Sequence, residues 1–335
     1  MSTKPVLGIM LGDAAGVGPE IVAKIAASGF LTEQCDPIII GDLRVLERAL
    51  KVTGGEVRLQ VIDNVDDADW TKGIPVLDRK NLDPEKVPFG TQTTESGAAC
   101  LDMLDMGIDL YQKGKIEGFC FAPLNKAGMK AAGCHYESEH HYMAHLLNHT
   151  DPFGEINVCE NVWTTRTTSH IPISEVSNNL TLESIGRAIR LSNYTLKNAG
   201  IEKPRIAVAA LNPHAGENGT CGREEIDVIT PAIEAARENG IDANGPFPSD
   251  ILFIKAFRGD YDGVVTMYHD QGQIALKLRG FDQGITIAGG FKPPIVTCGH
   301  GTAYDIAGKN IVKTSAFENA VKMAVRMANA ARNKK

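Results

Sequence analysis

The stretch that determines the fold is residues 261–310, YDGVVTMYHDQGQIALKLRGFDQGITIAGGFKPPIVTCGHGTAYDIAGKN. Its apolar run 263–267 predicts a buried strand that ends just before His269 and Asp270. Because α/β proteins place their ligand sites beyond the carboxyl ends of the strands, these two side chains are positioned for chemistry. A second strand is predicted over residues 285–288 and ends at a glycine pair.

Lys277 follows His269 in the same stretch and has apolar neighbours on both sides, Ile274, Ala275, Leu276 and Leu278. These neighbours are expected to hold its ammonium group near, rather than in, bulk water. A cation fixed in this way suits an anionic small-molecule substrate. The sequence therefore makes Lys277 a candidate substrate-binding residue.

The stretch ends in the run His300-Gly301-Thr302-Ala303-Tyr304-Asp305-Ile306-Ala307-Gly308-Lys309. This run resembles the adenosine-binding loop of the isopropylmalate and isocitrate dehydrogenases, and the resemblance makes His300, Gly301, Thr302 and Asp305 candidate cofactor-binding residues. A carboxylate at Asp305 accepts hydrogen bonds from ribose hydroxyls and repels the extra phosphate of NADP, so NAD is the expected cofactor. The alternative is a helix start with Asp305 near its positive end.

Composition excludes several classes of protein. The net charge of −7 and the lack of a basic tract argue against nucleic-acid and anionic-membrane partners. No apolar run approaches the roughly 20 residues that span a bilayer, and the N-terminus leads directly into a strand, so a cytoplasmic protein is expected. The seven cysteines show no Cys-x-x-Cys spacing, which indicates neither a disulfide framework nor a sulfur-ligated zinc site.

The remainder of the chain alternates between apolar runs and helical periodicity, which predicts an α/β protein of one large unit or two domains. Strands are predicted at residues 6–11, 38–40, 119–124 and 206–211, and helices at residues 43–51, 94–111, 224–238 and 316–332. A glycine turn, residues 12–18, precedes a helix that begins at Pro19. Such a turn can hold an anion, but its spacing is not the dinucleotide-binding fingerprint.

Two polar, proline-bearing segments predict irregular structure. Residues 63–88 are weakly periodic, which favours a meandering or edge-strand segment that could mark the start of a second lobe. Residues 245–250, GPFPSD, predict a rigid turn that presents Asp250.

Lys126 follows a predicted strand and is a candidate ligand contact, although a lone lysine more commonly flanks a helix at the surface.

Histidines occur in two settings. Residues 135–145 are dense in histidine and carboxylate but lack a His-Glu-x-x-His motif, which favours a substrate-facing loop over a local zinc site. His170, His214 and His269 each lie in a sequence context typical of a strand end. Three neutral imidazoles on separate loops can form an open metal site, but a hydrogen-bonded loop histidine is the alternative for each of them.

Motifs along nearly the whole chain resemble, in order, those of the PdxA family, which comprises 4-hydroxythreonine-4-phosphate dehydrogenase and its relatives. The chain is identified as a divergent member of this family on the following motifs: Gly12-Asp13, Gly16-x-Gly18-Pro19-Glu20, Ala122-Pro123-Leu124-Asn125-Lys126, Ser169-His170, Asn212-Pro213-His214-Ala215-Gly216-Glu217, Gly245-Pro246 with Asp250, Tyr268-His269-Asp270-Gln271-Gly272 and His300-Gly301-Thr302-Ala303.

The resemblance implies a fold like that of isopropylmalate and isocitrate dehydrogenase. Residues 1–335 would form a single dehydrogenase unit of two α/β lobes, with the chain passing between the lobes more than once and the active site in the cleft between them. The resemblance also implies a homodimer with shared active sites. His170, His214 and His269 match the family's divalent-metal ligands, the third supplied across the dimer interface, and Lys277 matches a substrate-binding lysine.

The implied reaction is NAD-dependent oxidation of a 3-hydroxy acid followed by loss of carbon dioxide. A divalent metal, with zinc expected and magnesium, manganese or cobalt as alternatives, polarises the hydroxyl group and then the ketone. Lys126, Asp250 and Asp270 are the candidates for moving the alcohol proton. The alternative for the two aspartates is that they orient metal-binding histidines.

Departures from the family pattern concern the substrate. Ser138-Glu139-His140-His141 stands where the family has Gly-His-Thr-Glu, Thr286 stands in place of an asparagine, and Ile295 in place of an arginine, with Lys292 nearby. Glu139, His140, Thr286 and Lys292 are therefore candidate substrate-binding residues. A missing arginine weakens a bidentate anion clamp, and Glu139 repels phosphate.

These departures leave several substrates open. The alternatives are a phospho-threonate or phospho-erythronate, or an unphosphorylated carboxylated cis-dihydrodiol of the terephthalate type. A binding protein that keeps the fold without catalysis is the non-enzyme alternative. The three histidines, Lys277 and the cofactor loop argue against it, because a pure binder needs no metal and nicotinamide sites together.

Overall fold

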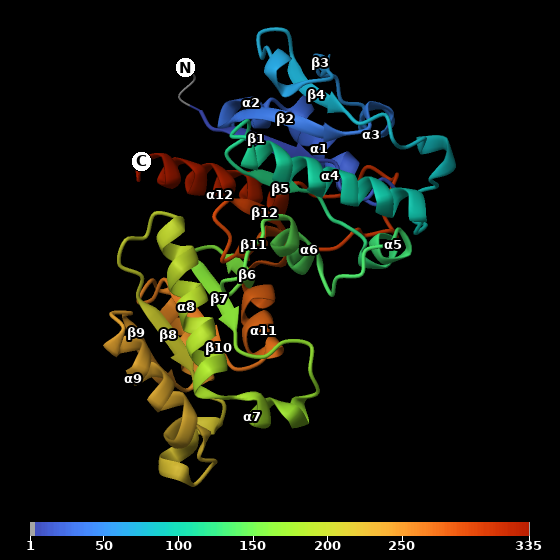
Figure 1. The fold of residues 1–335 in the computed structure, drawn as a ribbon. Helices are drawn as coiled ribbons and strands as arrows, with labels where there is room; N and C mark the ends of the chain where they lie inside the picture. The colour runs from blue at the N-terminus through green and yellow to red at the C-terminus, as the bar shows by residue number, and fades with distance from the viewer. Residues whose placement is uncertain (1–3, 335) are drawn as a thin grey trace. The chain divides into compact units, whose positions relative to one another are not determined.

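The computed structural model describes residues 4–334, which form two compact units. The first unit is the described part of Met1–Thr150 and Phe291–Lys335, and the second is Asp151–Gly290. The chain therefore enters the second unit after Thr150 and returns at Phe291 (Figure 1). Within residues 4–334, no helix is long and apolar enough to cross a membrane.

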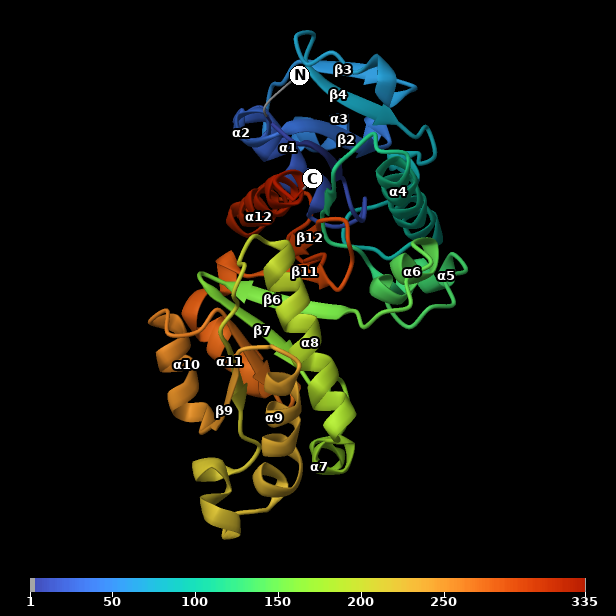
Figure 2. The same ribbon diagram turned by 60° about the vertical axis from the view of Figure 1, so that its left-hand side comes forward.

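The first unit is built on parallel strands in the order β3-β4-β2-β1-β5-β12. The strands are β1 Val6–Met10, β2 Asp36–Gly41, β3 Leu59–Ile62, β4 Ile74–Asp78, β5 Phe119–Phe121 and β12 Ile295–Cys298. The helices are α1 Gly18–Ala27, α2 Phe30–Gln34, α3 Leu43–Thr53, α4 Thr94–Gln112, α5 Lys126–Ala131, α6 Glu139–Leu146 and α12 Ser315–Arg332. Helices α1, α2 and α12 lie on one face of these strands and α4 on the other (Figure 2).

The strands at the centre of the first unit are apolar because helices cover them on both faces. Leu7, Ile9 and Met10 of β1 are fully buried, and so are Ile38, Ile39 and Ile40 of the neighbouring β2. Local signals set the helix ends. Asp42 caps α3 by accepting a hydrogen bond from the Arg44 amide, and Gly54 ends the helix with a φ of 68°.

The second unit has strands in the order β11-β6-β7-β10-β8-β9, in which only β6 runs against the others. The strands are β6 Gly154–Cys159, β7 Val162–Arg166, β8 Ile206–Ala209, β9 Ala243–Phe247, β10 Gly263–Thr266 and β11 Ile285–Gly289. The helices are α7 Val176–Asn179, α8 Leu182–Asn198, α9 Thr230–Glu238, α10 Ser249–Phe257 and α11 His269–Gly280. Helix α8 packs on one face, and α10 and α11 on the other (Figure 2).

The predicted α/β class is confirmed, and three local predictions are wrong. Residues 63–88 do not start a second lobe, and their strand β4 lies between β3 and β2 rather than at an edge. The predicted turn at Gly245-Pro246 is part of strand β9. Residues 304–310 form successive turns, so Asp305 is not at a helix start. Strand β12 was not predicted, because its four residues directly follow Pro293-Pro294.

Candidate active site

Four candidate residues follow the carboxyl ends of neighbouring parallel strands in the second unit. His170 comes after β7, His269 after β10, His214 after β8 and Asp250 after β9. Parallel strands end at the same edge of a sheet, and ligand sites of α/β proteins lie there. The topology thus carries these four residues to one edge of the sheet, as the sequence predicted for His269.

His170 and His269 are two candidate ligands that the structure brings close together. The segments that follow β7 and β10 remain hydrogen-bonded to each other. Thr168 donates its amide (3.1 Å) and its hydroxyl (2.8 Å) to the Met267 carbonyl. The two imidazole centroids lie 5.5 Å apart. Both rings line a hollow of about 310 Å³, together with Thr168, Ser169, Ile171, Ile173, Val176, Tyr268 and Asp270.

Asp270 is bonded to the histidine that precedes it. Its Oδ1 lies 2.6 Å from Nδ1 of His269, so Nδ1–H donates to the carboxylate and Nε2 is left as the basic nitrogen. This is the contact by which a carboxylate fixes the tautomer and orientation of a metal-binding histidine. The arrangement favours the orienting role for Asp270 over proton transfer.

His214 lies on a strained loop. Residues 214–218 all have positive φ, between 45° and 78°, although only Gly216 lacks a Cβ atom. The buried carboxylate of Glu225 holds the entrance to this loop, because Oε1 accepts hydrogen bonds from the amides of Leu211 (2.8 Å) and Asn212 (2.7 Å). Strain of this kind persists only where surrounding contacts enforce it, and it is common at functional sites.

One chain does not bring the three imidazoles together. His214 does not line the hollow beside His170 and His269, and the nitrogen atoms of the three rings do not all lie within 4.8 Å of one another. Asp250 is exposed, and its Oδ1 accepts a hydrogen bond from the Ile251 amide at the start of α10 (3.0 Å).

Lys277 is exposed on α11 rather than held in an apolar environment, so that prediction is wrong for the single chain. Its neighbours Ile274 and Leu278 are themselves 60% and 85% exposed. A local apolar sequence does not show whether the side chains are buried. Thr286, by contrast, is buried on β11, where its hydroxyl accepts a hydrogen bond from Asn157 (3.0 Å).

In the first unit, Lys126 and Glu139 form an ion pair. The Lys126 ammonium lies 3.4 Å from Oε2 of Glu139, so the charge of that carboxylate is partly offset. Lys126 begins α5, and Glu139 and His140 begin α6, which Ser138 caps. The prediction of a loop at residues 135–145 is therefore wrong for the part that forms α6. His141 bonds to Ser138 (2.9 Å), and His145 stacks on Tyr136.

The candidate cofactor residues lie together in the first unit. Nδ1 of His300 lies 3.0 Å from the Gly301 carbonyl, and a Cβ atom on Gly301 would meet no atom within 4 Å. Asp305 is exposed, and within residues 4–334 its carboxylate accepts no hydrogen bond. It is therefore available to hydroxyl donors. Lys292 is exposed at the start of the segment that returns to this unit.

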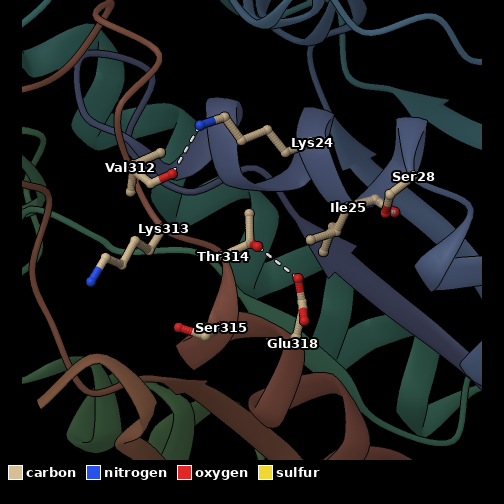
Figure 3. Close-up of a pocket in the computed structure, with 8 residues that line it drawn as sticks. All are labelled: Lys24, Ile25, Ser28, Val312, Lys313, Thr314, Ser315 and Glu318. Atoms are coloured by element: carbon tan, nitrogen blue, oxygen red, sulfur yellow. Dashed lines mark hydrogen bonds between the residues drawn. The ribbon is translucent and has the colours of Figure 1, made fainter. Parts of the chain in front are cut away.

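A separate hollow of about 500 Å³ lies between the end of α1 and the start of α12 (Figure 3). Lys24 donates to the Val312 carbonyl there (2.9 Å), and Thr314 donates to the Glu318 carboxylate (2.6 Å). None of the candidate site residues lines it.

Comparison with known proteins covers nearly the whole chain. A sequence model of the family described as "Pyridoxal phosphate biosynthetic protein PdxA" matches residues 33–324. The chain belongs to the PdxA family. It is 41% identical over 327 residues to the "Putative 4-hydroxythreonine-4-phosphate dehydrogenase 2" of Rhizobium meliloti (strain 1021), covering 97% of this chain and 94% of the relative.

Two further relatives carry related names. The "D-threonate 4-phosphate dehydrogenase" of Cupriavidus necator is 38% identical, with 97% of each chain covered. The crystal structure of 4-hydroxythreonine-4-phosphate dehydrogenase from Klebsiella pneumoniae superposes with a TM-score of 0.88 at 33% identity, covering 98% of this PdxA chain and 99% of that one. The predictions of PdxA membership and of an oxidoreductase that acts on a CH–OH group are confirmed.

The structure of this PdxA chain adds polar residues that sequence reasoning missed. Arg166, at the end of β7, donates to Ser169 (3.0 Å) and Asn157 (2.9 Å) and pairs with Glu155. Gln271 donates to the Ala210 carbonyl (2.7 Å) and accepts from the Met267 amide (2.7 Å), which fixes the His269 turn to the end of β8. Gln271 lies in the Tyr-His-Asp-Gln-Gly motif, the one sequence signal that pointed to it.

Proposed function

We propose that this PdxA-family chain is an NAD- and divalent-metal-dependent dehydrogenase that oxidises a phosphorylated 3-hydroxy acid and then decarboxylates the product. The proposal rests on one observation: the His170 and His269 rings lie side by side, and Asp270 is hydrogen-bonded to Nδ1 of His269. Relatives named as dehydrogenases of two four-carbon acids phosphorylated on carbon 4 support the substrate class.

The residues fit a divalent metal. Asp270 leaves Nε2 of His269 as a ligand atom, and the neighbouring His170 ring offers a second imidazole beside an open hollow. Imidazole ligands suit zinc better than magnesium. When bound, a divalent metal supplies Lewis-acid polarisation of the substrate hydroxyl and of the ketone that follows. We assign one of the three histidine ligands to a second copy of the chain, because one chain does not bring the three rings together.

The chain's own residues would bind and orient the reactants. Asp305 would accept hydrogen bonds from the ribose hydroxyls of NAD, since its carboxylate is exposed and unoccupied by donors among residues 4–334. Lys126 and Asp250 remain the candidates for holding or passing the hydroxyl proton. His140, Glu139, Lys277, Thr286 and Lys292 would bind the acid, and the Lys126–Glu139 pair lessens the repulsion of a phosphate.

A homodimer belongs to the same proposal. Exposed apolar side chains on α10 and α11 support an interface there: Ile251 is 50%, Ile254 59%, Ile274 60% and Leu278 85% exposed. Such side chains gain most from burial against a second copy. Lys277 also lies on α11, so a second copy at this interface would cover its side chain, which is exposed in one chain.

The substrates in the relatives' names differ at carbon 2, where 4-hydroxythreonine 4-phosphate has an amine and threonate 4-phosphate has a hydroxyl group. NADH formation should be measured with 4-hydroxythreonine 4-phosphate, D-threonate 4-phosphate, an unphosphorylated 3-hydroxy acid and a carboxylated cis-dihydrodiol, with zinc present or chelated. We expect turnover of a phosphorylated acid that chelation abolishes and zinc restores. Turnover of the unphosphorylated compounds alone would refute the substrate class, and no NADH with any of them would refute the dehydrogenase.

A further inference from the structure

Two buried carboxylates in the motif region Gly12–Glu20 have no role in the proposed chemistry. Asp13 is 2% and Glu20 1% exposed. Burial of a carboxylate is unfavourable unless hydrogen bonds compensate for the lost water. Within residues 4–334 neither makes an ion pair with a lysine, arginine or histidine, so both depend on neutral donors.

Asp13 bonds to the cofactor-loop residue Tyr304. The Tyr304 hydroxyl donates to Oδ2, while Oδ1 accepts from Ser96 Oγ (2.5 Å) and the Ala15 amide (2.9 Å). Burial, and then the hydrogen bond to Asp13 and its charge, raise the pKa of Tyr304. The phenol therefore stays a donor at neutral pH, and it fastens the loop to the motif.

Glu20 holds the other end of the same loop. Its Oε1 accepts from the Gly308 amide (2.5 Å) and its Oε2 from the Asn310 amide (3.0 Å). These partners are 288 and 290 residues away in sequence. Hydrogen bonds from amides to a carboxylate are stronger than those between neutral groups.

Between these two anchors the backbones are in contact. The Val17 amide donates to the Thr302 carbonyl (3.0 Å), and a Cβ atom on Gly16 would come within 2.8 Å of the same oxygen. Only glycine permits this approach. The loop also contains strained residues, because Ala303 and Asn310 have positive φ values of 45° and 57°. External contacts are needed to maintain such a conformation.

We propose that Asp13 and Glu20 are positioning residues that hold residues 302–310 in the shape that binds the adenosine half of the cofactor. The glycine motif is then a cradle for a loop of this chain instead of a site for an anion. The inference rests on the proposed function, because it assumes that residues 300–305 bind NAD. It explains why two buried carboxylates of one short segment both bond to that loop.

The test compares Glu20→Gln and Tyr304→Phe with the wild-type protein. NAD affinity is measured by calorimetry, and exchange of the loop amides by hydrogen–deuterium exchange. Loss of one charged hydrogen bond should weaken NAD binding about tenfold. Amide hydrogen exchange in residues 302–310 should become faster, and KM for the acid substrate should not change. Tyr142→Phe is the matched control, because Tyr142 also donates to an aspartate, Asp105, outside the loop.

The outcomes separate the two proposals. Wild-type NAD affinity and exchange in both folded variants would overturn the positioning role. If amide exchange in residues 302–310 is faster in the variants but the wild-type protein does not bind NAD, the proposed cofactor is wrong. The positioning role toward NAD would then be overturned as well. Tyr304→Phe removes one oxygen only, so it keeps the test valid if Glu20→Gln fails to fold.

Discussion

Oδ1 of Asp270 lies 2.6 Å from Nδ1 of His269, its neighbour in sequence, at the first turn of α11. Both side chains line the hollow that His170 shares. A carboxylate on one ring nitrogen fixes the imidazole plane and directs the lone pair of the other nitrogen outward. The sequence motif Tyr-His-Asp-Gln-Gly thus combines a proposed metal ligand, His269, with the carboxylate that orients its ring.

Asp270→Ala should weaken zinc binding by roughly 10- to 100-fold, because the His269 ring would lose its fixed orientation. Zinc affinity is measured by competition with a chromophoric chelator, independently of turnover. Asp227→Ala is the control, since Asp227 pairs with Arg223 at the surface of the same unit. Equal zinc affinity in wild type and Asp270→Ala would remove the orienting role.

Glu225→Gln should destabilise the protein by about 2 kcal/mol, because an amide cannot accept all the hydrogen bonds that the buried carboxylate accepts. Oε1 binds the Leu211 and Asn212 amides, and Oε2 binds the Asn212 side chain. Urea denaturation measures the loss. Glu234→Gln on the exposed side of α9 should change the free energy of unfolding little.

The strained loop gives this variant a second readout. Residues 214–218 rely on the Glu225 contacts to keep their positive φ values, so zinc affinity should fall together with stability. A variant that loses stability but binds zinc like the wild type would show that Glu225 supports the fold without positioning His214.

Ser177→Ala should reveal a pH-dependent contact. The Ser177 hydroxyl donates to Glu224 (2.6 Å) and, with backbone amides and Asn212, lowers the pKa of that carboxyl below its usual 4.5. A lowered folded-state pKa adds stability that is present above about pH 4.5 and is lost as pH falls through the folded-state value. The contribution is at most about 1 kcal/mol, because Glu224 is partly exposed.

Urea denaturation at several pH values measures the effect. The difference between wild type and Ser177→Ala should be constant at neutral pH and shrink below pH 4.5. In a Glu224→Gln background the same substitution should show no pH dependence. A difference that persists unchanged into acid would mean that the Ser177 hydroxyl acts through another group.

The buried strands could be predicted from sequence, because parallel strands covered on both faces are continuous apolar runs. Residues 38–40 of β2 and 263–265 of β10 illustrate this. Strand β9 was missed because Gly245-Pro246 is typical of turns. Proline is nevertheless tolerated in an edge strand, and β9 is an edge strand. The exposure of Lys277 was missed because apolar neighbours in sequence are not necessarily buried.

The sequence placed His170 and His269 near strand ends, but it did not predict that their rings would lie 5.5 Å apart. The residues that hold those positions were not predictable, because their contacts join distant parts of the chain. Thr168 meets Met267 across 99 residues, and Gln271 meets Ala210 across 61. No spacing rule connects such pairs before the chain is folded.

Asp305→Asn should weaken NAD binding about tenfold and narrow the preference for NAD over NADP, because the neutral amide no longer repels the extra phosphate. The dissociation constants of both cofactors are measured by calorimetry, and KM for the acid should not change. Asp66→Asn is the control, an exposed carboxylate of the same unit that pairs with Lys115. An unchanged ratio of NADP to NAD affinity would exclude Asp305 from the ribose site, and the loop would then have to bind the cofactor through His300 and backbone groups.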